Sequence, residues 1–254
     1  MRVRVERAGA VGRLTLARPE KKNALDRETA EELFSALRAL GEDREARAIL
    51  VDAEGDDFCA GADLDALAGM LDADEAAHRA DAETLGRVFL LLRELTKPVV
   101  AAVRGRALAG GAGLATACDV VLAHEHAVFG YPEVRVGFVP AMVMSMLRRT
   151  VGEKRAFELV ATGRTVSARE ALEMGLVSRV YTEAEFATSV REMTDLLARA
   201  PRDALGLTKR LFYDLDALPF RDAIERGVRV NVEARATDDF RAGVRRFVRR
   251  REDR

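Results

Sequence analysis

The chain has 254 residues, of which 48% are hydrophobic and 33% charged, and its formal net charge at pH 7 is -1. Such a chain can bury a large core, and its composition excludes a disordered tail, a membrane protein and a nucleic-acid binder that relies on bulk charge. The N-terminus alternates charged and apolar residues, and no later stretch reaches membrane-spanning length without charges. We therefore expect a cytoplasmic protein with no membrane or nucleic-acid partner. Cys59 and Cys118 lie in apolar or Gly/Ala-rich stretches, which predicts buried free thiols.

The first quarter of the chain predicts strands and one helix. Val3 to Val5 and Val11 to Leu16 are apolar runs separated by glycines, which indicates a β-hairpin. Asp26 can cap the helix that follows, and Gly41 marks its end. Ala48 to Val51 has the length and composition of another strand. Apolar residues of the helix share one face at helical spacing: Ala30, Leu33, Phe34, Leu37 and Leu40.

Two loops then lead directly into helices. In FCAGADL the chain turns at Gly61 and Ala62, and Asp63 can cap a helix extending to Leu71. After an amphipathic helix ending near Leu95 and the buried strand PVVAAV, the segment GRALAGGAGLATACD turns on glycines into a small-residue helix. The first N–H groups of a helix lack intrahelical partners and lie at the positive end of its dipole. Both loops thus offer donors for an anionic oxygen.

The second half of the chain is mostly helical. After the strand VVLA and the short stretch AVFGYPE, capping boxes and glycine stops delimit helices, and the last helix starts near Thr237 with an apolar face. Strands alternate with helices only in the first half, which predicts an α/β core at residues 1–190 and a helical region at 191–254 within one continuous unit. The capping boxes are Ser167 to Glu170 and Thr182 to Glu185, and the glycine stops are Gly163 and Gly175. The apolar face of the last helix consists of Phe240, Val244, Phe247 and Val248.

Four segments occur in an order that is specific as a set. They are LARPEKKNAL (Leu16 to Leu25), FCAGADL (Phe58 to Leu64), RGRALAGGAGLATACD (Arg104 to Asp119) and FGYPEVRVGFVP (Phe129 to Pro140). With them the chain resembles the crotonase superfamily, the enoyl-CoA hydratase/isomerase family, over nearly its whole length. The resemblance implies a right-handed spiral of β-β-α repeats with a helical C-terminal trimerisation region, and a homotrimer or a dimer of trimers.

The same resemblance implies an acyl-CoA thioester substrate, with coenzyme A as part of that substrate and no separate cofactor. It assigns an oxyanion hole for the thioester enolate to the backbone amides of Ala62 and Gly110, and an acid/base role to Glu133. Without the resemblance, Lys21 and Lys22 would be a solvated surface pair. The substrate- and CoA-binding residues that it implies are Lys22, Ala24, Leu25, Ala60, Gly61, Asp63, Leu64, Gly111, Gly113, Pro132 and Phe138.

Glu133 also has a physical basis for its role. It lies among Tyr131, Pro132, Val134 and Phe138, and a carboxylate in apolar surroundings has its pKa raised toward the working range of an acid/base catalyst. A two-glutamate hydratase of the family would carry its second carboxylate at position 113, where this chain has glycine. One carboxylate is enough to move a double bond, and enough for hydration if it both polarises water and delivers the proton.

Three functions stay open at this point. An enoyl-CoA hydratase is the favoured function, because the wider sequence of the last two motifs resembles family members that are assigned as hydratases. A 3,2-enoyl-CoA isomerase is the alternative, which the glycine at position 113 supports. Loss of the second carboxylate is also compatible with a CoA-ester binder whose chemistry is vestigial. The acyl group and the pathway, from fatty acids or branched-chain amino acids, are not determined. Pocket residues are expected to include Phe138, Val139, Met142, Met70 and Leu71.

No metal or nicotinamide site is expected. His124 and His126 lie in the polar link HEHA, where a turn surface is the better interpretation, and His78 is remote in sequence. The glycine spacing in GRALAGGAG differs from that of a dinucleotide fingerprint. Acidic residues beside the motifs are expected to serve as loop, cap or structural groups: Asp57, Asp63, Asp65 and Asp119.

Overall fold

The computed structural model describes the backbone of residues 1–252 and the side chains of residues 1–249. Its main sheet has six strands, in which β1 and β2 are antiparallel and all other neighbours are parallel. A second sheet has three short strands. In spatial order the main sheet is β1 (Val3–Ala8), β2 (Val11–Leu16), β3 (Ala48–Ala53), β4 (Val99–Val103), β6 (Val120–His124) and β9 (Arg179–Tyr181), and the second is β5 (Arg106–Leu108), β7 (Val128–Gly130) and β8 (Thr165–Ser167).

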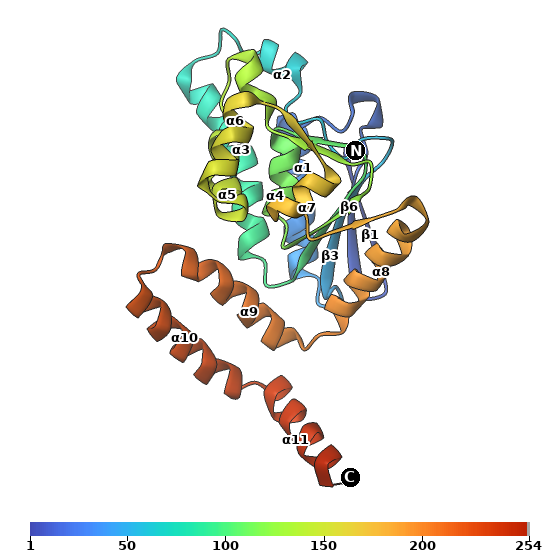
Figure 1. The fold of residues 1–254 in the computed structure, drawn as a ribbon, viewed down its shortest axis with the longest axis vertical. Helices are drawn as coiled ribbons and strands as arrows, with labels where there is room; N and C mark the ends of the chain where they lie inside the picture. Colours follow the sequence, from blue (N-terminus) through green and yellow to red (C-terminus); the bar gives the residue numbers. More distant parts are fainter. Residues whose placement is uncertain (253–254) are drawn as a thin grey trace.

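Helices cover both faces of the main sheet (Figure 1). On β4, Val99, Ala101 and Val103 face the larger core, which holds α1 and α3, whereas Val100 and Ala102 pack against α8. A strand buried on both faces is the expected partner of parallel neighbours. The helices are α1 (Arg27–Glu42), α2 (Leu64–Ala68), α3 (Glu75–Glu94), α4 (Gly110–Ala117), α5 (Ala141–Val151), α6 (Glu153–Thr162), α7 (Ala168–Met174), α8 (Glu183–Arg199), α9 (Arg202–Asp214), α10 (Phe220–Arg235) and α11 (Asp238–Glu252), with short 3-10 turns η1 (Pro19–Lys21), η2 (Pro132–Val136) and η3 (Leu215–Ala217).

The local predictions are largely confirmed. The opening hairpin forms, and the Asp26 carboxylate caps α1 by accepting a hydrogen bond from the Thr29 amide. Asp63 caps α2, but the prediction that this helix extends to Leu71 is wrong, because α2 ends at Ala68 with Gly69 as its C-cap. Leu71 is exposed, so no apolar burial extends the helix that far.

The C-terminal helices leave the body of the molecule as an arm, which Figure 1 shows as α9, α10 and α11. Helix α9 is anchored by the buried ammonium of Lys209, which donates to the Asp119 carboxylate at 2.7 Å and to the carbonyl oxygens of Leu92 and Lys97. The predicted structural role of Asp119 is thus confirmed. The division at residue 190 stays a prediction, and it falls within α8, which packs on the sheet through Phe186 and Val190.

The buried free thiols are confirmed, since both Cys59 and Cys118 are buried and unpaired with each other. Burial raises the pKa of the Cys59 thiol to about 12. Among the described residues, no helix is long and apolar enough to cross a membrane.

Candidate active site

Backbone hydrogen bonds bring the two predicted CoA-binding loops side by side. The Leu25 amide donates to the Gly61 carbonyl at 2.7 Å, and the Asp63 amide donates back to the Leu25 carbonyl at 2.9 Å. The Ala60 amide donates to the Lys22 carbonyl at 3.0 Å. These bonds form a short parallel bridge between segments almost forty residues apart. The loop of the first motif is therefore a fixed neighbour of the second.

A second set of bonds ties the FCAGADL loop to β5. The Cys59 amide donates to the Arg106 carbonyl at 3.0 Å, and the Leu108 amide donates to the Cys59 carbonyl at 2.9 Å. A side chain at Gly61 would place its Cβ 2.8 Å from the Leu108 carbonyl oxygen and 3.4 Å from the Gly110 nitrogen, and Gly61 has φ +94°. Only glycine permits this approach, which brings the two loop-to-helix junctions together.

The amides of Ala62 and Gly110 are available as donors. Within the part of the chain that the structure describes, neither donates to a backbone acceptor, and both residues line one cavity. Ala109, directly before α4, has the left-handed φ of +50°. Its amide donates to the Gly130 carbonyl at 2.8 Å, which holds it there. A strained residue at this point fixes the direction of the Gly110 amide.

The cavity has a volume of about 160 Å³ and lies between α1, α2, α3, α4 and the segment after η2. Of the pocket residues expected from sequence, Met70, Phe138, Val139 and Met142 line it and Leu71 does not. Its lining is mainly apolar, as is usual for a small-molecule site. The remaining lining residues are Leu25, Asp26, Arg27, Ala30, Ala62, Asp63, Ala66, Leu67, Asp81, Ala82, Leu85, Ala109, Gly110, Glu133, Pro140, Ala141 and Val143.

Glu133 lies on η2 with its side chain turned into this cavity. It is 8% exposed, and its Oε2 atom has no hydrogen-bond partner among the described residues. Burial raises the pKa of Glu133 above its ordinary value. An unpartnered buried carboxyl group in a cavity is a candidate acid/base catalyst. The 3-10 turn that carries Glu133 is closed by Gly137.

Sequence reasoning missed the contact that joins Glu133 to the Gly110 helix. Tyr131 is fully buried, and its hydroxyl lies 2.9 Å from the Thr116 hydroxyl on α4. Thr116 in turn donates to the Ala112 carbonyl at 2.7 Å. The aromatic residue directly before Pro132-Glu133 was the available signal. This pair fixes η2 against α4, and so positions the carboxyl group relative to the oxyanion amides.

Gly113 and Gly111 lie behind the cavity wall. A Cβ at Gly113 would lie 2.5 Å from Val143 Cγ2 and 3.2 Å from Phe89 Cζ, and one at Gly111 would overlap the Cys59 carbonyl oxygen. Neither glycine lines the cavity, so their predicted substrate contacts stay predictions. The space that a second carboxylate would need is filled by Val143 of α5.

The other predicted substrate contacts divide by position. Leu25, Asp63 and Phe138 line the cavity, although the Asp63 carboxylate is engaged by the α2 amides and by Arg18 at 3.0 Å. Lys22 is exposed and has φ +54°. The remaining predicted contacts do not line the cavity, and their roles stay predictions. They are Lys22, Ala24, Ala60, Gly61, Leu64 and Pro132. Asn23, which the resemblance also implies as a residue of the CoA-binding loop, has a buried side-chain amide that donates to the carbonyls of Glu54 and Asp57 and so holds the loop.

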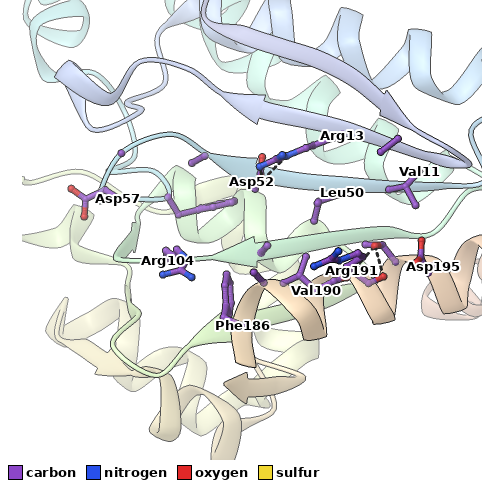
Figure 2. Close-up of a pocket in the computed structure, with 17 residues that line it drawn as sticks. Val11, Arg13, Leu50, Asp52, Asp57, Arg104, Phe186, Val190, Arg191 and Asp195 are labelled. Atoms are coloured by element: carbon purple, nitrogen blue, oxygen red, sulfur yellow. Dashed lines mark hydrogen bonds and ion pairs between the residues drawn. The ribbon is translucent and has the colours of Figure 1, made fainter. Parts of the chain in front are cut away.

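A second groove of about 440 Å³ lies on the far side of the sheet, between β2, β3 and β4 and helix α8 (Figure 2). Its charged groups are mostly paired, with Arg13 on Asp52 at 2.6 Å and Arg104 on Glu183 at 2.7 Å. None of the predicted site residues lines it. Among the described residues, no group of three or more His, Cys, Asp or Glu side chains is arranged to hold a metal ion. The smaller cavity is therefore the candidate active site.

Comparison with known proteins agrees with this geometry. The sequence model described as enoyl-CoA hydratase/isomerase matches residues 6–254. A Thermus thermophilus protein provisionally named an enoyl-CoA hydratase is 39% identical over 249 residues, 98% of each chain. The enoyl-CoA hydratase structure of Mycobacterium smegmatis superimposes with a TM-score of 0.93 at 30% identity, covering 98% of this chain and 97% of that one. The 4-chlorobenzoyl coenzyme A dehalogenase-2 of Arthrobacter is 35% identical over 209 residues, 82% of this chain and 76% of that protein.

The chain belongs to the enoyl-CoA hydratase/isomerase family, and its fold is the crotonase fold. Both predictions from sequence are confirmed. The likeness to a dehalogenase means that family membership alone does not specify the reaction, which has to be argued from the site.

Proposed function

We propose that this chain is an enoyl-CoA hydratase, which adds water reversibly to a 2-enoyl-CoA thioester. One observation carries the proposal: the amides of Ala62 and Gly110 and the buried Oε2 atom of Glu133 share a cavity, and none of them has a hydrogen-bond partner among the residues that the structure describes. Relatives of closely similar length named as enoyl-CoA hydratases support it.

In the proposed reaction, the two amides donate hydrogen bonds to the thioester carbonyl oxygen. Negative charge reaches that oxygen when a nucleophile adds at C3, and donors already in position stabilise it. Glu133, as a carboxylate, takes a proton from water while the water oxygen bonds to C3 and the C2–C3 double bond shifts toward the carbonyl. The enolate then collapses, and Glu133 returns the proton to C2. One carboxyl group thus completes the cycle.

A 3,2-enoyl-CoA isomerase is the second candidate, because Val143 fills the space for another carboxylate. Here Glu133 would take a proton from C2 of a 3-enoyl-CoA and return it at C4, with the same oxyanion amides. The names of the hydratase relatives favour hydration over this reaction.

Absorbance of the conjugated thioester tests both reactions. Crotonyl-CoA should lose absorbance with wild-type protein, and Glu133→Gln should lower kcat by about 10²–10⁴-fold with unchanged CoA-ester affinity. A gain of absorbance from a 3-enoyl-CoA, with no loss from crotonyl-CoA, would establish the isomerase instead. No turnover of either substrate would leave a CoA-ester binder.

We further propose that the paired loops hold coenzyme A. Backbone groups of residues 22–25 and 60–64 would bind the adenine and pantetheine amides, and Lys22 would meet a phosphate. In support, the loops are hydrogen-bonded to each other and the Lys22 side chain is exposed. Lys22→Ala should weaken binding of butyryl-CoA but leave the much weaker binding of a pantetheine thioester unchanged.

A homotrimer, alone or paired into a hexamer, is the proposed assembly. The arm exposes apolar side chains at helical spacing, which a second copy of the chain would cover. Val228→Asp on α10 should therefore reduce the solution mass toward the 27.9 kDa of one chain, whereas Leu196→Asp on α8, also exposed, should not. The exposed apolar residues on α10 and α11 are Phe220, Ile224, Val228, Val232, Phe240, Val244, Phe247 and Val248. Two free buried thiols support a reducing compartment, the cytoplasm.

A further inference from the structure

Five residues with ionisable side chains line the active-site cavity: Asp26, Arg27, Asp63, Asp81 and Glu133. A charged group in a largely apolar cavity requires a partner or a function, since its desolvation costs free energy. The partners of these five side chains therefore separate structural charges from functional ones.

Three of the five have partners on the protein. Asp26 accepts from Arg18 at 3.0 Å and caps α1. Asp63 accepts from the same guanidinium at 3.0 Å and caps α2. Arg27 donates to Glu31 at 2.9 Å, one turn along the helix. The Asp26 and Asp63 carboxylates thus hold the loops that form the cavity, whereas the Arg27 pair lies within α1.

The other two, Glu133 and Asp81, have no ion-pair partner among the side chains of residues 1–249. Glu133 is the proposed acid/base. Asp81 is half-buried on the N-terminal half of α3 and is used by no step of the reaction. A second unpaired carboxylate in the cavity needs its own explanation.

The position of Asp81 relative to the oxyanion amides follows from helix geometry. Leu85 Cδ2 would lie 3.6 Å from a Cβ at Gly110, and Asp81 is four residues earlier on the same face of α3. One turn is about 5.4 Å, so Asp81 lies about that far along α3 from the residue that meets Gly110. Phe138 and Met142 line the same cavity. An acyl group bound in this cavity would therefore share it with the Asp81 carboxylate.

We propose that Asp81 determines which acyl groups the cavity accepts, by disfavouring acyl chains that end in a carboxylate. The inference rests on the proposed function in one respect, that the cavity holds the acyl group of a CoA thioester. A carboxylate has only acceptor atoms, so it offers no hydrogen bond to another carboxylate. Two such groups about 6 Å apart repel enough, at an effective dielectric constant of about 20, to weaken binding roughly tenfold to hundredfold.

Binding of two saturated CoA esters tests this without turnover. Hexanoyl-CoA and adipoyl-CoA have acyl groups of equal carbon number, one ending in a methyl group and the other in a carboxylate. Calorimetry should give the wild-type protein at least tenfold tighter binding of hexanoyl-CoA. Asp81→Asn, which removes the charge at nearly constant volume, should reduce that ratio to about threefold or less while the hexanoyl-CoA Kd stays within twofold.

Asp72→Asn is the matched control. It removes the same charge from an exposed residue nearby in the chain that does not line the cavity, so its ratio should equal that of the wild type. Equal binding of both esters by the wild-type protein would overturn the inference. So would an Asp81→Asn ratio that matches the wild-type ratio.

Hydration of 2-hexenoyl-CoA, measured separately, distinguishes this inference from the proposed function. Selectivity that depends on Asp81 without hydration would refute the hydratase and leave the inference in place. Hydration together with a selectivity that does not depend on Asp81 would support the hydratase and refute the inference. Failure to bind either ester would overturn both.

Discussion

Replacement of Gly113 by alanine tests whether Val143 occupies the place of a second carboxylate. The new Cβ would lie 2.5 Å from Val143 Cγ2, closer than any ordinary contact. Overpacking of this kind costs about 2 kcal/mol, and replacing a glycine within α4 returns about 1 kcal/mol of helix propensity. We expect a net loss of about 1 kcal/mol of unfolding free energy, and a melting temperature lower by roughly 2–4 °C.

The contact itself is measured by a double-mutant cycle. Val143→Ala alone should cost about 1.6 kcal/mol, from two buried carbon groups at about 0.8 kcal/mol each. In the double variant the added Cβ meets the space that valine vacated, so the double variant should be more stable than the sum of the single changes by at least about 1 kcal/mol. Urea unfolding of all four proteins provides the values. Additivity to within about 0.5 kcal/mol would refute the assignment of this space to Val143.

Three further predictions concern protonation, strain and the anchor of the arm. Because burial raises the folded-state pKa of Glu133 above 4.5, its contribution to stability is present below that pH and is lost as pH rises through the raised value. The difference in unfolding free energy between the wild-type protein and Glu133→Gln should therefore decrease as pH rises from 4.5 through the raised pKa. A difference that stays flat or increases with pH would contradict the burial argument. Ala109→Gly should relieve the strain of a left-handed φ and raise the unfolding free energy by about 1 kcal/mol, after the entropy cost of glycine is subtracted. The same change should lower kcat, because the Gly110 amide is less fixed. Chemical denaturation measures the first effect and initial rates measure the second. Lys209→Ala should cost about 3 kcal/mol by removing a buried ammonium and leaving the half-buried Asp119 carboxylate without its cation, and a loss below about 1 kcal/mol in thermal unfolding would show that Lys209 is not a buried anchor.

Much of the fold could be predicted because its signals are local. The Asp26 and Asp63 caps and the stops at Gly163 and Gly175 depend on residues within one helical turn, and all four are found. The extension of α2 to Leu71 failed because apolar composition does not show whether a core is there to cover it. Burial is a property of the whole chain, and single segments do not carry it.

The candidate site was predictable in its parts and not in its assembly. Ala62, Gly110 and Glu133 were named from motifs, and the structure brings all three to one cavity. The contacts that hold them there join residues distant in sequence, such as Tyr131 with Thr116. Asp81 carried no sequence signal at all, because a charged residue on an amphipathic helix is usually solvated. Only the cavity shows that it faces inward.

Gly113 has a different meaning in the structure from the one that the sequence indicated. From sequence it marked a missing carboxylate, and so a site that lacks one group. In the structure its Cβ position is closed by Val143 and Phe89, so the wall behind the oxyanion amides is packed and apolar rather than vacant. A packed wall excludes water from that side and raises the strength of the amide and carboxyl interactions in the cavity. A chain built this way concentrates its proton chemistry on Glu133, which makes the pH dependence of that one group the most direct measure of the mechanism.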